Sequence, residues 1–391
     1  MLNQTMRQRG EARSVIREAF EYGNMRAKEV GKENVSDFSI GNPSVPAPKC
    51  VQEEIERLLQ ETPPEVLHGY TSAPGLPEVR KAVSNYIKTA FGAPMHENLV
   101  YMTCGAAASL CITFNALYEK GDEFVVVAPF FPEYRVFIES AGGKVVTAMS
   151  DKDFRLDLNA LDKVIGKHTK AVVINSPCNP TGVVYGEREL AALGALLKKK
   201  SEEKGEPIFL IADEPYRELT YGAVVPYVPK YYDNTIVCYS FSKSVSLAGE
   251  RIGYIAISPL CADPEGMFAA VSGAGRSLGY VCAPALFQRV CAVCLGQTSD
   301  IAVYNENREL LYNALTEYGY ECIKPEGAFY LFVKTPQPDA AEFCARAKKY
   351  DVLLVPSDSF GVKGYVRISY CVGKQTILRA LPVFKKLIQE G

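Results

Sequence analysis

Short apolar runs alternate with amphipathic segments through the middle of the chain, from about residue 98 to residue 258. Seven of these runs have the length and the β-branched content of buried strands, at 99–102, 124–127, 144–147, 171–174, 208–212, 235–239 and 252–257. Segments with helical periodicity lie between several of them, at 106–118, 132–141 and 187–203. Because continuously apolar strands that alternate with helices form parallel sheets covered on both faces, the pattern predicts an α/β fold with a mostly parallel seven-stranded sheet.

The hydrophobic pattern changes after residue 284. A long helical pattern at 284–318 is followed by terminal helices and by short apolar runs at 321–324, 328–333, 353–355 and 366–369, which is typical of a smaller α+β domain. A charged, helix-like segment at 1–31 and a proline-rich segment at 41–48 precede the first run. Because 391 residues exceed the usual size of one core, we predict a large domain at 46–284 and a small domain made of 1–45 and 285–391.

Composition and charge exclude several classes of function. Hydrophobic residues make up 48% of the chain and charged residues 23%, as in ordinary globular proteins. The formal net charge of −2, without a basic run, argues against binding to nucleic acid or to an anionic membrane surface. We expect no membrane partner, since no stretch reaches the roughly 18 apolar residues that span a bilayer and the N-terminus has no signal-peptide pattern.

The twelve cysteines are scattered along the chain, many of them inside apolar runs. One C-x-x-C pair, Cys291 and Cys294, lies in a helix-like segment, without the second pair of a zinc site or the βαβ context of a redox site. We therefore expect no metal site. We expect the cysteines to be buried apolar side chains of a protein in the reducing cytoplasm.

Small and polar residues follow the predicted strands, at the edge where open α/β sheets bind ligands. The turn at Ala106 and Ala107 lets helix amides approach a phosphate, although tight packing alone also explains small residues there. Phe131 follows the next strand and is able to stack on a flat ring or to fill the core. In the sequence N-S-P-C-N-P-T-G at 175–182, the prolines and the glycine fix a loop that holds Asn179 rigidly.

Two charged residues lie at or in apolar runs, where each needs a partner of opposite charge. Asp213 ends the run at 208–212. A protonated pyridine nitrogen is one candidate partner, and capping of a short helix is the alternative role. Tyr216, three residues on, is able to donate a hydrogen bond to an oxygen of the same ring. Arg367 suits a planar anion such as a carboxylate, or a structural ion pair.

Lys243 follows the predicted strand at 235–239 in the pattern S-x-S-K. Ser240 and Ser242 precede it and Arg251 follows eight residues later, so these residues would place an amine nucleophile beside a phosphate site. Pyridoxal phosphate (PLP) is the carbonyl cofactor that uses lysine amines most. A solvated loop lysine is the alternative for this residue taken alone.

Taken in order, these motifs resemble the class I/II aminotransferases, which are PLP-dependent enzymes of fold type I with aspartate aminotransferase as the archetype. The resemblance runs from F-S-I-G-N-P at 38–43, through G-Y-T-S-A-P-G at 69–75, to Arg367, and its most specific parts are N-P-T-G and S-x-S-K-x7-R. It implies an enzyme that moves an amino group between an L-amino acid and a 2-oxo acid by a ping-pong mechanism. A C–S β-lyase of the cystathionine β-lyase kind shares the cofactor residues and is the alternative.

The resemblance assigns a role to each residue around the cofactor. Lys243 would bind PLP as a Schiff base and then shuttle a proton, and Asp213 would keep the pyridine nitrogen protonated. Asn179 and Tyr216 would hydrogen-bond the ring oxygen, and Phe131 would stack on the ring. The phosphate would be held by two turns and an arginine, through Ala106, Ala107, Ser240, Ser242 and Arg251.

The resemblance also describes the substrate pocket and the assembly. Arg367 would clamp the α-carboxylate of the substrate, with Gly41 and Asn179 lining the same pocket. The residue that matches Tyr70 reaches the phosphate of the neighbouring subunit in the family. The resemblance therefore implies a homodimer with shared active sites.

The chain departs from the family pattern in two places. Glu250 stands where many members have tryptophan before the phosphate arginine, and the chain has no tryptophan. The turn at 105–108 lacks the lysine that assists the distal carboxylate of acidic substrates in bacterial aspartate-type enzymes. Arg17 or Arg276 could replace it, or each could form a surface or interface salt bridge. The sequence therefore leaves the substrate open.

Overall fold

A seven-stranded sheet forms the centre of the computed structural model, which describes residues 2–11 and 14–390. Neighbouring strands in the order β2-β8-β7-β6-β5-β3-β4 are parallel, except that β8 is antiparallel to both β2 and β7. The strands are β2 (Val100–Thr103), β3 (Glu123–Ala128), β4 (Lys144–Met149), β5 (Thr169–Asn175), β6 (Phe209–Asp213), β7 (Thr235–Ser240) and β8 (Gly253–Ile257). The predicted α/β fold with a mostly parallel seven-stranded sheet is confirmed.

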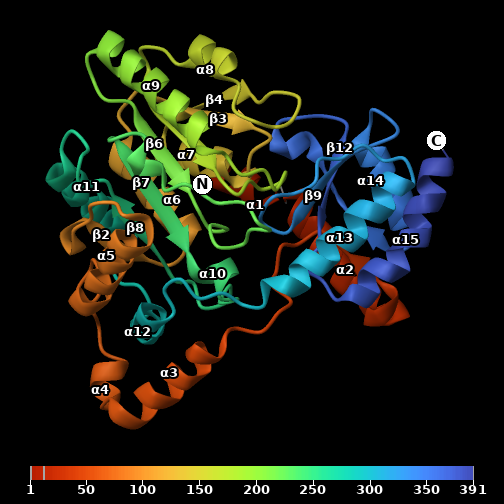
Figure 1. Ribbon diagram of the computed structural model, residues 1–391, viewed down its shortest axis with the longest axis horizontal. Helices are drawn as coiled ribbons and strands as arrows, with labels where there is room; N and C mark the ends of the chain where they lie inside the picture. Colours follow the sequence, from red (N-terminus) through yellow and green to blue (C-terminus); the bar gives the residue numbers. More distant parts are fainter. Residues whose placement is uncertain (1, 12–13, 391) are drawn as a thin grey trace.

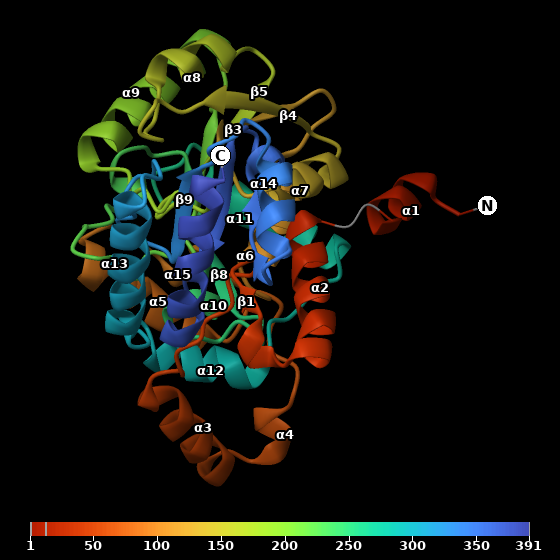
Figure 2. The same cartoon turned by 90° about the vertical axis from the view of Figure 1, so that its right-hand side faces the viewer.

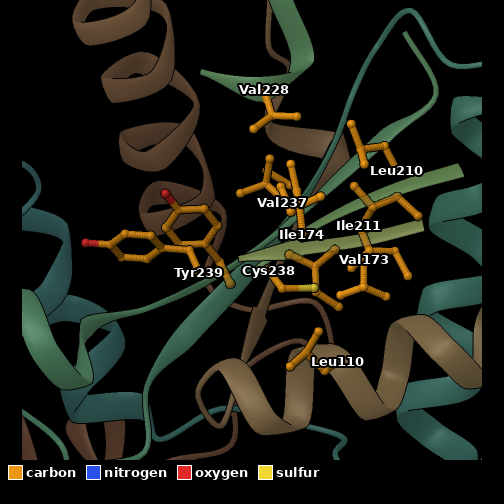
Figure 3. Close-up of a cluster of buried hydrophobic side chains, with 14 of the residues drawn as sticks. Leu110, Val173, Ile174, Leu210, Ile211, Val228, Val237, Cys238 and Tyr239 are labelled. Atoms are coloured by element: carbon orange, nitrogen blue, oxygen red, sulfur yellow. The ribbon is translucent and has the colours of Figure 1, made fainter. Parts of the chain in front are cut away.

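The central strands of the sheet are buried on both faces, as continuously apolar strands require. Ile211 on β6 and Val237 on β7 expose at most 1% of their surface. Figure 3 shows Leu110 and Val228 on opposite sides of these strands. They come from α6 (Ala106–Leu117) and the short helix η3 (Val228–Lys230). The other two helices predicted around the sheet are α7 (Glu133–Ala141) and α9 (Glu187–Lys204).

A second group of strands and helices lies beside this sheet (Figure 1). Three strands form an antiparallel sheet in the order β11-β12-β9, with β9 at Tyr330–Lys334, β11 at Val355–Pro356 and β12 at Tyr365–Ser369. The two-residue strands β1 (Ser36–Asp37) and β10 (Val352–Leu353) pair in parallel. The helices of this group are α2 (Val15–Val30), α13 (Ile301–Glu317), α14 (Ala340–Lys348) and α15 (Lys374–Gln389).

The buried apolar residues form two clusters, one over the seven-stranded sheet and one in the second group of elements. This separation supports the division into domains at 46–284 and at 1–45 with 285–391, which stays a prediction. The helix that follows residue 284, α12 (Ala285–Val293), packs on α3 (Lys49–Glu61) and α5 (Pro77–Phe91). It contributes Val290 and Cys291 to the cluster of the large sheet.

The smaller group differs from its predicted elements in three ways. The helical pattern at 284–318 is two helices, α12 and α13, because Gly296 takes a left-handed conformation and the Asp300 side chain caps the start of α13. The run at 321–324 forms only an isolated bridge, from Cys322 to Val333. The run at 353–355 is divided between β10 and β11.

The N-terminal helical prediction at 1–31 corresponds to α1 (Gln4–Glu11) and α2, and residues 1, 12 and 13 lie outside the described residues. Figure 2 shows α1 projecting from the rest of the molecule. The remaining elements are short or lie at the periphery, namely α4 (Pro64–Leu67), α8 (Leu158–Val164), α10 (Phe241–Ser244), α11 (Pro264–Ser277), η1 (Lys32–Asn34), η2 (Glu97–Leu99) and η4 (Ser357–Phe360). Within residues 2–11 and 14–390, every helix is too short or too polar to cross a membrane.

Candidate active site

The carboxyl ends of three neighbouring strands meet at one edge of the large sheet. β5 ends at Asn175, β6 at Asp213 and β7 at Ser240. A cavity of about 180 Å³ opens there, where parallel sheets place their ligands. The described residues that line it are Ala106, Ala107, Leu110, Phe131, Asn175, Asn179, Asp213, Pro215, Tyr216, Ser240, Ser242, Lys243, Ala248 and Arg251.

One side of the cavity collects groups that bind anions. Ala106 and Ala107 form the first turn of α6, whose free amides carry partial positive charge. Ser240 Oγ donates to Ser242 Oγ over 2.8 Å, and an Arg251 Nη atom donates to Ser242 Oγ over 3.4 Å. Gly105 precedes the helix with a φ of 86°, and a Cβ there would lie 3.2 Å from the Arg251 guanidinium. The arrangement suits a compact dianion such as a phosphate group.

A buried carboxylate also lines the cavity. Asp213 exposes 4% of its surface, and its Oδ2 accepts a hydrogen bond of 2.5 Å from the Tyr134 hydroxyl. Its Oδ1 has no hydrogen-bond partner among the described residues. Burial raises the pKa of Asp213 to about 7, against the hydrogen bond from Tyr134 that lowers it. A cationic hydrogen-bond donor in the cavity would satisfy Oδ1 and return the group to its charged form.

Lys243 lies in α10, in the turn that follows β7. Its Nζ atom donates a hydrogen bond of 2.5 Å to the carbonyl oxygen of Gly41. Burial, together with the positive charges of Arg251 and Arg367, lowers the pKa of Lys243 to about 8. A lysine in this state is partly neutral near physiological pH, as an amine nucleophile must be.

Arg367 is fully buried on β12 and extends toward the N-P-T-G loop. Its Nη atoms donate to Asn179 Oδ1 over 3.0 Å and to the Ser39 carbonyl over 2.5 Å. Its Nε atom has no partner among the described residues. The guanidinium also lies 4.6 Å from the ring centre of Tyr330. These partners are all neutral, so the contacts of Arg367 differ from the structural ion pair that the sequence left open.

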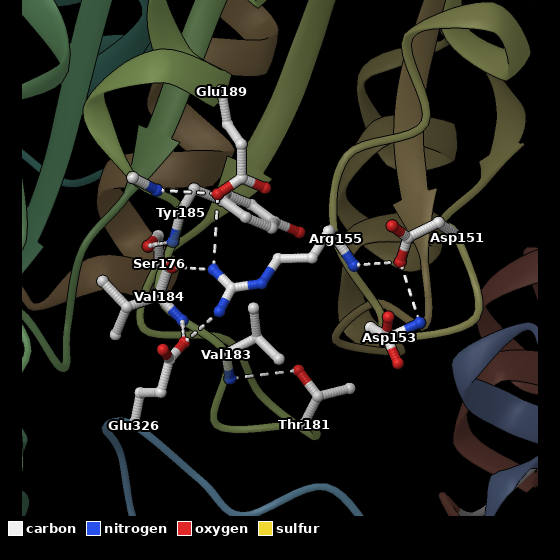
Figure 4. A network of polar contacts seen from close by, with 11 residues as sticks. Asp151, Asp153, Arg155, Ser176, Thr181, Val183, Val184, Tyr185, Glu189 and Glu326 are labelled. Carbon is white, nitrogen blue, oxygen red and sulfur yellow. Dashed lines mark hydrogen bonds and ion pairs between the residues drawn. The ribbon is translucent and has the colours of Figure 1, made fainter.

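The loop that carries Asn179 is fixed by a polar network (Figure 4). Arg155 bridges the Val184 carbonyl to the Glu326 carboxylate, and Glu326 also accepts from the Val184 amide. The Ser176 hydroxyl accepts from the amide of Tyr185 over 2.9 Å. Because Glu326 belongs to the smaller group of elements, this network joins the two groups at the loop that follows Asn179.

Most of the residues selected from the sequence converge on the cavity. Ten of the predicted cofactor residues line it, namely Ala106, Ala107, Phe131, Asn179, Asp213, Tyr216, Ser240, Ser242, Lys243 and Arg251. Gly41 and Arg367 border it through their bonds to Lys243 and Asn179. Tyr70 is fully exposed and lies outside the cavity. Arg17 and Arg276 are exposed as well, and neither lines the cavity.

Three further residues of the site were not predicted from the sequence. The Asn175 side chain holds the Asp213 carbonyl and the Asn179 amide, and it lies in the motif already identified. Tyr134 also lies in a motif noted for its phenylalanine, but nothing in the sequence marks it as the partner of Asp213. Tyr330 contacts the Tyr216 hydroxyl over 2.9 Å, and its own hydroxyl occupies the space that a Cβ at Gly41 would need.

Comparison with known proteins decides the family. A sequence model of the family described as aminotransferase class I and II matches residues 33–383. The chain belongs to this family. As a member of it, this chain is an aminotransferase. The enzymes of the family use pyridoxal phosphate.

Individual relatives of this aminotransferase cover almost all of its length. It is 32% identical to the aspartate aminotransferase of Thermotoga maritima, over 89% of this chain and 90% of the relative. It is 30% identical to a protein of Bacillus subtilis named probable N-acetyl-LL-diaminopimelate aminotransferase, over 89% of this chain and 88% of the relative. A solved structure of an amino transferase from Eubacterium rectale is 52% identical, covers 100% of this chain and 99% of its own, and superimposes with a TM-score of 0.97.

Proposed function

We propose that this aminotransferase holds PLP in the cavity at the end of β5, β6 and β7. There it moves an amino group from an L-amino acid to a 2-oxo acid in two successive half-reactions. The observation that carries the proposal is that one cavity is lined by Lys243, by Asp213 and by the anion-binding groups of α6, Ser240, Ser242 and Arg251. The twelve free cysteines are typical of a reducing compartment, so a cytoplasmic location is part of the proposal.

The residues around the cavity fit PLP. The unpaired Oδ1 of Asp213 lacks the donor that a protonated pyridine nitrogen would supply. The first turn of α6, the serine hydroxyls and Arg251 would hold the phosphate, and Phe131 would lie against the ring. Since Arg367 already donates to Oδ1 of Asn179, the Asn179 amide nitrogen is the atom to donate to the ring oxygen, together with the hydroxyl of Tyr216.

When bound, PLP supplies an electron sink for the negative charge that forms when the substrate Cα loses its proton. The residues of the chain move and control that proton. Lys243 Nζ would take it from Cα, and a pKa of about 8 lets the same amine give it back near neutral pH. The Gly41 carbonyl orients the amine, and Asp213 in its charged form would keep the ring nitrogen protonated.

Arg367 would bind the α-carboxylate of the substrate. A bidentate pair needs two adjacent N–H donors, and Nε is the buried donor that the described residues leave unpaired. Asn179 and the Ser39 carbonyl hold the guanidinium in place through its other nitrogens. This contact involves only the part of the substrate that all amino acids share, so it does not select a side chain.

We also propose that the enzyme is a homodimer in which Tyr70 reaches the phosphate site of the partner. Tyr70 is 100% exposed, and Val66 nearby in the sequence is 51% exposed. A fully exposed tyrosine beside exposed apolar residues suits burial in an interface. Substitution Tyr70→Phe should leave the molar mass of the dimer unchanged and weaken PLP binding. Unchanged PLP affinity would contradict the shared site.

The test is a matrix of amino-acid donors and 2-oxo acid acceptors, including aspartate, alanine and aromatic donors, assayed with the purified holoprotein. Lys243→Ala should abolish both turnover and the near-visible absorption of the bound cofactor. Lys152→Ala, which changes a lysine whose side chain is 89% exposed, is the matched control. Release of pyruvate from cystathionine without a 2-oxo acid, and without any transamination, would refute the proposal in favour of a C–S β-lyase.

A further inference from the structure

Two thiols from distant parts of the chain touch each other outside the active site. Cys50 Sγ and Cys294 Sγ lie 3.3 Å apart, although 244 positions separate the residues in the sequence. Cys50 is the second residue of α3 and is half-buried, whereas Cys294 directly follows α12 as its C-cap residue and exposes 1% of its surface. Figures 1 and 2 both show α12 next to α3.

These thiols lie where the chain passes between its two apolar clusters. Val45 belongs to the second cluster and Val51 to the first, so the first connection between the clusters runs from Val45 to Val51 and contains Cys50. The second connection runs from Cys294, in the first cluster, to Tyr304, in the second cluster. The two connections also share a hydrogen bond, from the Val45 amide to the Tyr304 hydroxyl, over 3.3 Å.

The turn that carries Lys243 is hydrogen-bonded at or next to both connections. Gly41, four residues before Val45, provides the carbonyl that accepts from Lys243 Nζ. The second connection provides the Ser299 amide, which donates to the Ser244 carbonyl over 2.7 Å. A covalent bond between Cys50 and Cys294 would therefore act on both supports of Lys243.

We propose that Cys50 and Cys294 form a reversible disulfide under peroxide stress, and that this bond lowers transamination by constraining the two connections. A disulfide has an S–S length near 2.05 Å, so the two sulfur atoms must approach by about 1.3 Å from their separation of 3.3 Å. The neighbouring Cys291, which shares the C-x-x-C spacing with Cys294, lies in the apolar cluster on the same helix.

The environment distinguishes the roles of the two thiols. Burial raises the pKa of Cys294, and its hydrogen bond to Cys50 and the charge of nearby Glu54 raise it further. Cys50 lies in the first turn of α3 and is half-buried. Cys50 is also the more exposed of the two, so it is the thiol that meets the oxidant.

The chemistry balances with hydrogen peroxide as the oxidant. The Cys50 thiolate attacks one peroxide oxygen, the O–O bond breaks, and the products are Cys50 sulfenic acid and hydroxide, which is protonated to water. The Cys294 sulfur then attacks the sulfenic sulfur, the S–S bond forms, and a second water leaves with the thiol proton. Peroxide thus takes both electrons, and a dithiol reductant returns them.

The test uses the purified holoenzyme treated with a small molar excess of hydrogen peroxide. Mass spectrometry of an unreduced digest should detect a peptide pair that joins residues 50 and 294. Transamination should fall on the order of tenfold, because small displacements of a catalytic group have large effects on rate, and dithiothreitol should restore it. Cys344→Ser, which changes a half-buried cysteine on α14, is the matched control and should behave like the wild type.

Cys50→Ser and Cys294→Ala should form no linked peptide and should keep their activity after the same treatment. Melting temperatures measured before oxidation identify a variant that fails to fold. If one variant fails, the other alone is sufficient for the test. Oxidation that stops at an acid on Cys50, without the linked peptide, would overturn the proposal. A linked peptide with unchanged activity would overturn the effect on Lys243. The activity measurement rests on the proposed transamination, whereas the peptide measurement does not.

Discussion

The unpaired carboxylate of Asp213 gives a prediction about stability that does not depend on turnover. In the cofactor-free protein, burial raises the pKa of Asp213 from 3.8 to about 7. The folded state therefore binds a proton more tightly than the unfolded state, and the free energy of unfolding falls as the pH rises between these two values. Above about pH 7 the ionised group destabilises the fold by about 4 kcal/mol, at about 1.4 kcal/mol for each pH unit between 3.8 and about 7.

Asp213→Asn removes this titration while keeping a similar shape and an oxygen for the Tyr134 hydroxyl. The buried amide adds a cost of its own, about 1–3 kcal/mol if it is unsatisfied, but that cost does not change with pH. We therefore expect the stability of Asp213→Asn, relative to the wild type, to increase by about 3 kcal/mol from about pH 5 to about pH 8. The direction follows because only the wild type loses stability as its carboxyl ionises.

Urea unfolding of both cofactor-free proteins across this pH range measures the difference. Asp153→Asn is the control, since the Asp153 side chain is 56% exposed and remains hydrated in both states. Parallel pH profiles for the wild type and Asp213→Asn would refute the reasoning. Adding PLP should flatten the wild-type profile, because a pyridinium partner stabilises the charged carboxylate.

Three further predictions concern the other residues of the site. PLP should react with the cofactor-free protein at a rate that rises with pH around a midpoint near 8, because Lys243 reacts as the neutral amine and burial lowers its pKa to about 8 from 10.5. Near-visible absorption follows the reaction, and a midpoint near 10.5 would contradict the lowered pKa. Arg367→Lys should raise KM for all amino acids by roughly tenfold to a hundredfold with the cofactor spectrum unchanged, because lysine cannot form the bidentate pair. Steady-state kinetics that show only a lower kcat would argue against the contact between Arg367 and the α-carboxylate. Tyr134→Phe should weaken PLP binding by roughly tenfold, the loss of one hydrogen bond to a charged group, in a fluorescence titration; unchanged affinity would exclude a role for this bond.

Long, regular elements could be predicted because their signal is local. The seven strands of the large sheet were located to within a few residues, since most of them are continuous apolar runs that are buried on both faces, whereas the edge strand β4 is partly exposed. The short strands β1, β10 and β11 have two residues each, which is too few to show a period. The break between α12 and α13 depends on one left-handed glycine and one capping side chain, which an apolar helical pattern conceals.

The amino-acid sequence was sufficient to predict the fold class and most of the cavity residues. Polar and small residues that follow successive parallel strands must meet at one edge of the sheet, so Asn179, Asp213 and Lys243 could be grouped before any contact was known. The spacing of their motifs then carried the resemblance to the aminotransferases.

Which of these groups are paired, and which are left without a partner, depends on the packing of the folded chain. Tyr134 meets Asp213 across 79 positions of sequence, Arg367 meets Asn179 across 188, and Cys50 meets Cys294 across 244. No local pattern encodes such contacts, because they depend on how separate elements pack. The raised pKa of Asp213 and the lowered pKa of Lys243 have the same origin, since both follow from burial that the folded chain alone creates.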